Sequence, residues 1–365
     1  MIKTAYYQDL TKMNTFGMKV KARCFMEYDS VADLVDIEFE ELARPVLHIG
    51  GGSNLLFTDD FKGTILHSKI NFIEILDECH SDRDSHCHFD RAERVEKSQE
   101  TVLVSVGAGV VFDDFCDWAA KEGLWGVENL SYIPGEVGAS AVQNIGAYGV
   151  EVKDVIRNVY CYDTVEEEFV NFDVEDCEYG YRDSVFKNPE IKGRYIVTHV
   201  VFALSRTPQP KLEYGNLKGG LEGHPEESLT PVQIRKAIIK IRKEKLPEPS
   251  VKGSAGSFFK NPVISAEQFA KIEASAKAEL GVDYKVPHYD LPDGTVKVPA
   301  AWMIEQCGWK GKRSGGAAVW DKQPLVIVNY TGEAYPEEII GLEKRIIASV
   351  KSKYGIDLHP EVEHV

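Results

Sequence analysis

The sequence predicts a protein of mixed helices and strands, with α+β or α/β architecture and two to three domains. Three observations lead to this prediction. Short apolar runs typical of strands alternate with amphipathic runs typical of helices. Glycine-rich loops directly follow predicted strands, at 50–54 and 107–109. The length of 365 residues exceeds that of one ordinary domain and allows sizeable hydrophobic cores without disulfides.

The predicted elements follow in chain order. We expect a helix over 29–42 and strands over 45–49 and 63–67, then a strand over 101–106 and a helix over 110–122 that Gly123 ends. Strands are predicted over 153–163, 167–174 and 194–204. A helix over 230–245 has Thr230 as its N-cap and Pro231 at its first position. The last third predicts helices over 265–279, 300–307 and 336–354 and a strand over 325–329. Pro247 and Pro249 indicate a domain boundary near 246–250.

Charge and composition exclude several classes of protein. The net charge of −16 argues against a nucleic-acid-binding surface. No run approaches the roughly 18 apolar residues of a membrane-spanning helix, and the N-terminus has no signal-peptide core. The seven cysteines, an odd number scattered through a long chain, suit reduced thiols. We therefore expect a cytoplasmic protein.

One segment, 74–100, is charged, rich in histidine and poor in large apolar residues. It predicts an exposed insertion, either a long hairpin or partly disordered. Its histidines and cysteines, Cys79, His80, His86, Cys87 and His88, could bind zinc, but their spacing matches no standard zinc finger. A solvated loop is favoured, and no metal is expected.

Two glycine-rich segments are candidates for binding an anion or a flat group. In Gly50, Gly51, Gly52, Ser53 and Asn54, backbone N–H groups can approach a phosphate, although a structural tight turn is the alternative. The segment 132–149 lets a bulky, flat group lie against the main chain, or else allows two backbones to cross closely.

Three further positions carry side chains that are useful in catalysis. Arg182 offers a planar fork for a carboxylate or phosphate, which Asp183 could fix, although a surface salt bridge is the default interpretation. No nucleophile elbow surrounds Ser257, so proton donation suits it better than attack. Glu361, near the C-terminus, would ordinarily be solvent-exposed. The basic glycine loop 308–316 could face an anion or simply be solvated.

Together these motifs resemble the UDP-N-acetylenolpyruvoylglucosamine reductase family. The matching strings run in the family's order from residue 14 to Glu361. They include PVLHIGGGSNLLF (45–57), ENLSYIPGEVGASAVQNIGAYGVE (128–151), YGYRDSVFK (179–187), YGNL (214–217), KLPEP (245–249) and GSAGSFFKNPV (253–263). YGNL and KLPEP place the chain in the branch with a tyrosine-bearing substrate loop.

The resemblance implies an α+β fold in three domains. A two-part FAD-binding module of the vanillyl-alcohol-oxidase type would comprise 1–68 with 352–365, and 69–246. A third α+β domain, 247–351, would bind substrate. The tail would return to the first domain and bring Glu361 to the flavin.

The resemblance also assigns ligands. FAD would be held by residues of the two glycine-rich segments, namely Gly50, Gly51, Gly52, Ser53, Asn54, Pro134, Gly135, Gly138, Ala139, Val142 and Gly146. The sugar nucleotide would be bound by Tyr148, Tyr214, Lys245, Asn261 and, less certainly from its flanks, Gln323.

The implied reaction has two halves. NADPH reduces FAD and leaves; then flavin N5 delivers hydride to C3 of the enolpyruvyl group, giving UDP-N-acetylmuramate for peptidoglycan synthesis. Arg182 and Glu361 would stabilise the aci-carboxylate, and Ser257 would protonate C2. A glutamate beside an enolate helps only when it is neutral, so its pKa should be raised.

Two other interpretations stay open. A flavin-dependent sugar or alcohol oxidase of the same superfamily predicts oxygen reactivity and often a covalent flavin link. No histidine lies in 132–149 to form one. A binding module without turnover is disfavoured, because Arg182, Ser257 and Glu361 are all present. We expect small-molecule partners only, no nucleic acid and no membrane insertion, and a monomer.

Overall fold

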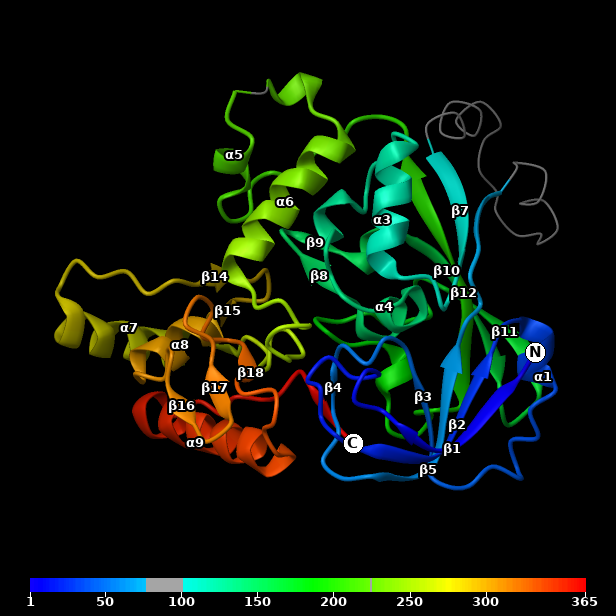
Figure 1. Cartoon of the computed structure of the whole chain (residues 1–365). Coiled ribbons are helices and arrows are strands. Elements are labelled where there is room, and N and C mark those ends of the chain that lie inside the picture. The colour runs from blue at the N-terminus through cyan, green and yellow to red at the C-terminus, as the bar shows by residue number, and fades with distance from the viewer. Residues whose placement is uncertain (77–100, 224) are drawn as a thin grey trace. The chain divides into compact units, whose positions relative to one another are not determined.

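The chain folds into two compact units of mixed helices and strands, so the predicted α+β class is confirmed. The structure, a computed structural model, describes residues 1–76, 101–223 and 225–365 (Figure 1). The insertion's cluster of cysteines and histidines lies outside these residues. Unit 1 comprises Met1–Gln8, Lys21–Gly52 and Phe61–Lys243, and unit 2 comprises Asp9–Val20, Ser53–Asp60 and Glu244–Val365. The division into three domains stays a prediction.

The first sheet of unit 1 has the strand order β1-β2-β5-β3. Its strands are β1 (Lys3–Asp9), β2 (Lys21–Tyr28), β3 (Val46–Ile49) and β5 (Phe61–Ser68), and β5 runs parallel to both β2 and β3. Central parallel strands are covered on both faces, which explains why β5 is buried from Gly63 to Ser68. Ile49 pairs with His67, so the glycine loop that follows β3 begins beside the end of β5.

The predicted helix over 29–42 is wrong in length. Only α1 (Val31–Val35) forms, with Ser30 as its N-cap accepting a hydrogen bond from Asp33 N at 3.1 Å. Beyond it the chain turns irregularly and still buries Ile37 and Phe39 in the same core as Leu34. The apolar spacing therefore predicted burial correctly, but it predicted a longer helix than the one that forms.

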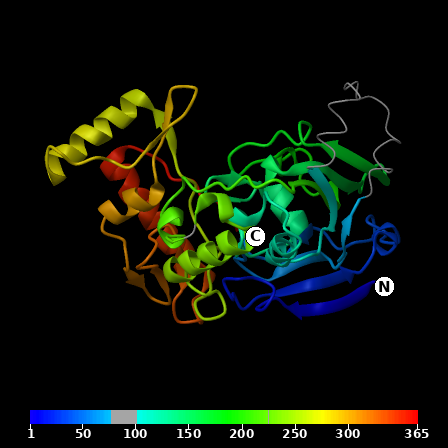
Figure 2. The same cartoon turned by 90° about the horizontal axis from the view of Figure 1, so that it is seen from above.

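The second sheet of unit 1 is antiparallel, with the order β11-β10-β12-β7-β6. Its strands are β6 (Ile73–Ile75), β7 (Thr101–Gly107), β10 (Ile156–Asp163), β11 (Glu168–Asp173) and β12 (Tyr195–Ser205). The predicted strands are confirmed, except that Val152–Asp154 form a 3-10 turn before β10. Helices α3 (Phe112–Lys121) and α4 (Val137–Gln143) share a hydrophobic core with β7, β10 and β12 (Figures 1 and 2).

The remaining elements of unit 1 are mostly short. They are the 3-10 turns Glu128–Leu130, Val185–Lys187 and Glu226–Ser228, the pair β8 (Gly146–Ala147) and β9 (Val150–Glu151), and α5 (Leu217–Gly220). The exception is α6 (Pro231–Lys245), whose prediction is confirmed. Thr230 and Gln233 exchange hydrogen bonds at its start, the reciprocal cap that the sequence favours there.

Unit 2 contains two small antiparallel sheets and three helices. One sheet has the order β13-β15-β14 and the other β16-β17-β18. The helices α7 (Ala266–Leu280), α8 (Ala300–Gln306) and α9 (Pro336–Tyr354) agree with the predicted ones. The strands are β13 (Val263–Ser265), β14 (Tyr289–Asp290), β15 (Thr295–Lys297), β16 (Arg313–Ser314), β17 (Ala317–Val319) and β18 (Ile327–Asn329).

The C-terminal tail of unit 2 is held by strand pairing. β19 (Glu363–His364) pairs in parallel with β4 (Leu55–Leu56). Glu363 N donates to Asn54 O at 2.9 Å, and both N and Oγ1 of Thr58 donate to Val365 O at 2.8 Å. The tail is therefore fixed mainly by main-chain hydrogen bonds and depends little on its exposed side chains.

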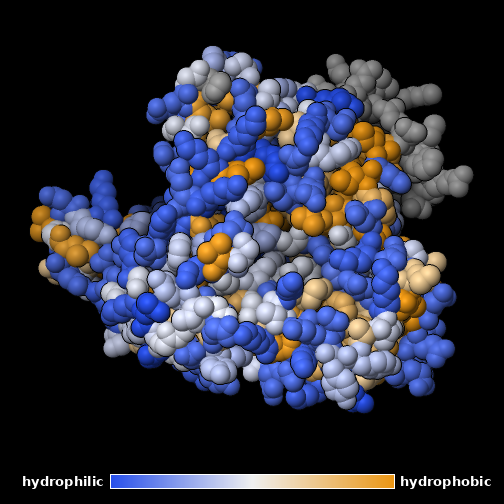
Figure 3. All heavy atoms as spheres, viewed as in Figure 1, coloured by the Kyte–Doolittle hydropathy of each residue, from blue (hydrophilic) through white to orange (hydrophobic). Residues whose placement is uncertain are grey.

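One face of the surface is shown by hydropathy in Figure 3. On the face in Figure 3, apolar residues gather in small groups among hydrophilic ones. Among the described residues, no helix is both long and apolar enough to cross a membrane.

Deleting residues 362–365 removes these main-chain bonds and the buried Val362. At about 0.5–1.5 kcal/mol for each hydrogen bond, the free energy of unfolding should fall by roughly 2–4 kcal/mol. Urea denaturation measures the change. Val365→Ala keeps the main-chain bonds and should stay within about 1 kcal/mol of the wild type. An equal loss in both variants would mean that the Val365 side chain, and not the pairing, holds the tail.

Candidate active site

Two backbone segments of unit 1 pack closely against each other. A Cβ added to Gly50 would lie 3.0 Å from Cβ of Ala139 and 3.3 Å from Oε2 of Glu136. A Cβ on Gly51 would lie 3.5 Å from Cα of Gly135. The predicted phosphate loop and the predicted flavin-lining segment are thus brought together. We call these two segments, 50–54 and 132–149, the cradle. Their glycines and alanines carry no bulky side chain, and loops of this composition offer backbone N–H groups that suit the FAD diphosphate.

Helix α4 has a fixed place in this cradle. Gly138 donates its amide to Ala108 O at 3.0 Å, and a Cβ on Gly138 would lie 2.9 Å from Cβ of Ala108. Gly138 therefore serves close packing, and its amide already has an acceptor. Ser184 Oγ donates to Val142 O at 2.7 Å, which ties the other end of α4 to the segment that carries Arg182.

The guanidinium of Arg182 is held by carbonyl oxygens of the flavin-lining segment. Its NH1 donates to Asn144 O at 3.1 Å and its NH2 to Gly146 O at 2.6 Å. A Cβ on Gly146 would stand 2.9 Å from NH1, so only glycine fits there. The side chain of Asp183 accepts from Ser184 N at 3.1 Å. The fork is thus oriented by main-chain oxygens.

Tyr148 and Tyr214, both expected to bind substrate, lie together in unit 1. Their rings meet edge to face with centroids 6.4 Å apart. Burial raises the pKa of the Tyr148 hydroxyl, which the neighbouring cation Arg242 opposes. Asn129 Nδ2 donates to Tyr148 O at 2.9 Å and fixes the backbone of this residue, whose φ is +48°. The pair offers two phenols, of which the Tyr148 hydroxyl lies near the half-buried cation Arg242.

The predicted catalytic residues of unit 2, Ser257 and Glu361, are linked through Phe258, the residue that follows Ser257. Glu361 N donates to Phe258 O, and Phe258 N donates to Leu325 O, both at 2.8 Å. Phe258 and Phe259 are almost fully buried and anchor the loop, whereas Ser257 and Glu361 are half-buried. The tail therefore lies beside the serine loop, and the two are joined by an isolated antiparallel bridge between Phe259 and Pro360.

The other predicted positions of unit 2 each have hydrogen-bond partners of their own. Asn54 Nδ2 donates to Glu361 O at 3.1 Å, so the end of the glycine loop contacts the tail directly. Asn261 Oδ1 accepts from Ala300 N at the start of α8. Gln323 lies in the connection between β17 and β18 and accepts from Val326 N. Lys245 is exposed at the end of α6, and its carbonyl accepts from Trp320 Nε1 at 3.0 Å.

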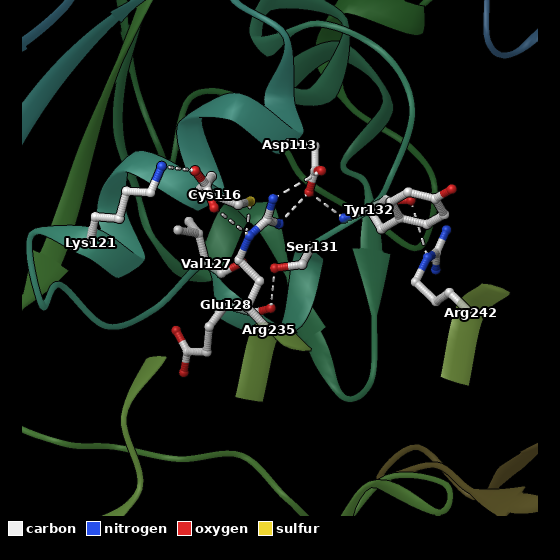
Figure 4. Close-up of polar contacts among 10 residues, drawn as sticks. Asp113, Cys116, Lys121, Val127, Glu128, Ser131, Tyr132, Arg235 and Arg242 are labelled. Atoms are coloured by element: carbon white, nitrogen blue, oxygen red, sulfur yellow. Dashed lines mark hydrogen bonds and ion pairs between the residues drawn. The ribbon is translucent and has the colours of Figure 1, made fainter. Parts of the chain in front are cut away.

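An ionic network docks α6 on α3 (Figure 4). Arg235 donates through two nitrogens to the carboxylate of Asp113, and through Nε to Asp117 at 3.1 Å. Asp113 also accepts from Tyr132 N, and Arg242 Nε donates to Tyr132 O at 3.1 Å (Figure 4). Tyr132 has a φ of +61°, so both its main-chain groups are held in a left-handed conformation.

Sequence analysis missed the residues of this network. Asp113 and Arg235 look like ordinary charges on amphipathic helices. Only the helical spacing of Arg235 and Arg242, two turns apart on one face of α6, offered a signal. In the segment that contains α4, the sequence pattern indicated the glycine-rich composition but did not predict the helix.

Comparisons with known proteins agree with this arrangement. A family model described as an FAD binding domain matches residues 23–168, and one described as the C-terminal domain of UDP-N-acetylenolpyruvoylglucosamine reductase matches residues 248–365. A UDP-N-acetylenolpyruvoylglucosamine reductase from Bacteroides fragilis is 49% identical over 357 residues, which cover 98% of each chain. The chain belongs to the UDP-N-acetylenolpyruvoylglucosamine reductase family.

More distant members give the same result. The reductase of Porphyromonas gingivalis is 44% identical, covering 98% of this chain and 97% of its own, and that of Chromobacterium violaceum is 42% identical, covering 97% and 96%. The crystal structure of the reductase from Thermus caldophilus covers 100% of this chain and 98% of its own with a TM-score of 0.62. At 22% identity it supports the fold alone. The chain is accordingly an oxidoreductase with an FAD-binding domain, as predicted.

Arg235→Ala should loosen α6 from α3, because it leaves Asp113 with a half-buried, unpaired charge. Removing one partner of a buried pair costs about 3–5 kcal/mol, and partial exposure reduces this to roughly 2–3 kcal/mol in the free energy of unfolding. Chemical denaturation measures it. Lys236→Ala, exposed on the same helix, is the matched control and should change little. Similar values for the two variants would show that the network does not hold the helix.

Proposed function

We propose that this family member is an NADPH-dependent FAD enzyme that reduces the enolpyruvyl group of UDP-N-acetylenolpyruvoylglucosamine to give UDP-N-acetylmuramate. FAD, when bound, supplies the hydride chemistry, accepting from NADPH and delivering to C3. The chain's own residues bind, orient and move a proton. The observation that carries the proposal is the pairing of the tail with the serine loop, which sets Glu361 beside Ser257.

The cradle supplies the cofactor site in this proposal. Gly50, Gly51 and Gly52 with Ser53 and Asn54 would hold the FAD diphosphate through backbone donors. Pro134, Gly135, Gly138, Ala139, Val142 and Gly146 would line the remainder. Glycine at positions 50, 51 and 135, where the two segments meet, supports this assignment, since larger side chains there would occupy the space.

Arg182 orients and stabilises the substrate carboxylate in this proposal. Charge builds on that carboxylate as hydride adds to C3, and a preorganised guanidinium stabilises it without reorganising. Its anchoring on Asn144 O and Gly146 O supports preorganisation, because the fork is held before substrate arrives. Glu361, in its neutral form, would donate to the same carboxylate.

Ser257 would transfer its hydroxyl proton from Oγ to C2 of the aci form. A serine is a weak acid, yet the carbanionic carbon is a strong enough base to accept the proton. The rigid loop supports this role, since Phe258 is held on both its main-chain groups. Tyr148, Tyr214, Lys245, Asn261 and Gln323 would bind the sugar nucleotide, Lys245 and Tyr214 at its diphosphate.

Anaerobic stopped-flow spectroscopy tests the proposal. Flavin absorbance is followed after NADPH is added, and then after UDP-N-acetylenolpyruvoylglucosamine is added. Bleaching by NADPH followed by recovery that depends on the sugar nucleotide supports it. Bleaching reversed only by oxygen would instead favour the sugar or alcohol oxidase.

Ser257→Ala should leave reduction of the flavin by NADPH intact and slow the second half-reaction by roughly 10²-fold or more, because the proton donor is lost. Single-turnover kinetics with the sugar nucleotide measure this step. Ser250→Ala, an exposed serine upstream in the same connection, is the control and should behave as the wild type. Full reoxidation by substrate in Ser257→Ala would remove Ser257 from the mechanism.

Arg182→Lys tests the planar fork, because a lysine keeps the charge but lacks the five donors in fixed planar geometry that bind a carboxylate through two parallel hydrogen bonds. We expect flavin reduction by NADPH at the normal rate and a second half-reaction slower by about 10²-fold. The exposed Arg206, changed to lysine, is the control. If Arg182→Lys turned over normally, charge alone would suffice and the fork would be irrelevant.

A further inference from the structure

Three buried or half-buried ionisable side chains form a line of hydrogen bonds that ends at the glycine loop. His67, at the end of β5, places Nδ1 3.1 Å from Oε1 of Glu27 on β2, and Nε2 3.0 Å from Oε1 of Glu136. The other oxygen of Glu136, Oε2, lies 3.3 Å from where a Cβ of Gly50 would stand. The imidazole and the Glu136 carboxylate are 2% and 9% exposed. A buried carboxylate therefore abuts the loop proposed to hold a diphosphate.

The Glu27–His67–Glu136 contacts constrain which of their nitrogen and oxygen atoms can carry a proton. A carboxylate only accepts hydrogen bonds, and a neutral imidazole has a single N–H. With a carboxylate oxygen at each ring nitrogen, an imidazolium donates to both oxygens, whereas a neutral ring donates to only one of them.

With His67 as an imidazolium, the charges balance. Lys69 Nζ stands 3.8 Å from Oε1 of Glu27, so two cations face the two carboxylates, Glu27 and Glu136. The neighbouring titratable groups add no charge. Burial lowers the pKa of His48 to about 3, which leaves it neutral, and the Tyr28 hydroxyl lies 2.7 Å from His48 Nε2.

We propose that His67 is a positioning residue for the cofactor: as an imidazolium it neutralises Glu136 and holds that side chain against Gly50, so that the glycine loop can accept an anionic diphosphate. Glu136 bridges the two halves of the cradle, because it immediately precedes α4 and touches the loop after β3. Without the imidazolium, the same carboxylate would face the diphosphate as a like charge. This inference rests on the proposed FAD site.

A double-mutant cycle separates charge compensation from packing. The full-length protein is stripped of flavin and titrated with FAD, followed by flavin fluorescence. We expect His67→Gln to weaken FAD binding by about tenfold or more, since Glu136 is left charged and uncompensated. Glu136→Gln should stay within about threefold of the wild type. The double variant should recover to within about threefold, because the charge that needed compensation is gone.

Other outcomes overturn the inference. If the double variant binds as weakly as His67→Gln, the histidine acts by packing alone. If Glu136→Gln weakens FAD as much as His67→Gln, the carboxylate is itself required. His199→Gln, which changes a histidine on β12 in the other sheet, is the control and should leave FAD affinity unchanged. If the wild type binds no FAD, the proposed site fails too, whereas a normal wild type with an additive cycle overturns this inference alone.

A second measurement does not depend on stable variants. Nitrogen-15 NMR of the histidine rings at pH 7 should show both nitrogens of His67 protonated. A neutral ring there would mean that the shared proton sits on a carboxyl group, and the proposed compensation would be wrong.

Discussion

The close approach of two backbones in unit 1 is the constraint on which the rest of its site depends. Gly50 lies so close to Ala139 that an added Cβ would stand 3.0 Å from the Ala139 Cβ, and Gly51 packs against Gly135 at van der Waals distance. Gly138 meets Ala108 in the same way from the other side of α4. The helix is thereby held between the end of β3 and the loop after β7, and its position is not adjustable.

The position of α4 also determines the position of the residues that follow it in the chain. α4 ends at Asn144, whose backbone is left-handed with a φ of +44°. Asn144 O and Gly146 O, which follow directly, are the two acceptors that hold the Arg182 guanidinium. Arginine orientation is thus set by main-chain oxygens whose positions follow from glycine contacts. A substitution at Gly138 would therefore alter the orientation of the Arg182 side chain without direct contact between the two residues.

The sequence predicted the fold class and most long elements, because burial periodicity survives in helices and strands. It failed at 29–42, where Ile37 and Phe39 are buried without a helix, and at α4, whose small residues carry no amphipathic pattern. Site residues inside long motifs could be proposed from the matching strings of the family, and their roles stay predictions. Asp113, His67 and Arg242 could not, because each acts as one side chain on an ordinary element, and its partner is distant in sequence.

Charge decides how such a site can work in a chain of net charge −16. The ligands proposed for it, FAD, NADPH and a sugar nucleotide, are all anionic, so the average field opposes them. Screening confines that opposition to roughly 8–10 Å at physiological ionic strength, and binding is decided by the groups within that radius. Arg182, Arg242 and the backbone amides of the glycine loop are favourable there. Glu136 is not, and it can remain beside Gly50 only where a buried cation offsets it. In this proposal, the pairing of Glu136 with His67 makes an acidic residue compatible with a loop that binds an anion.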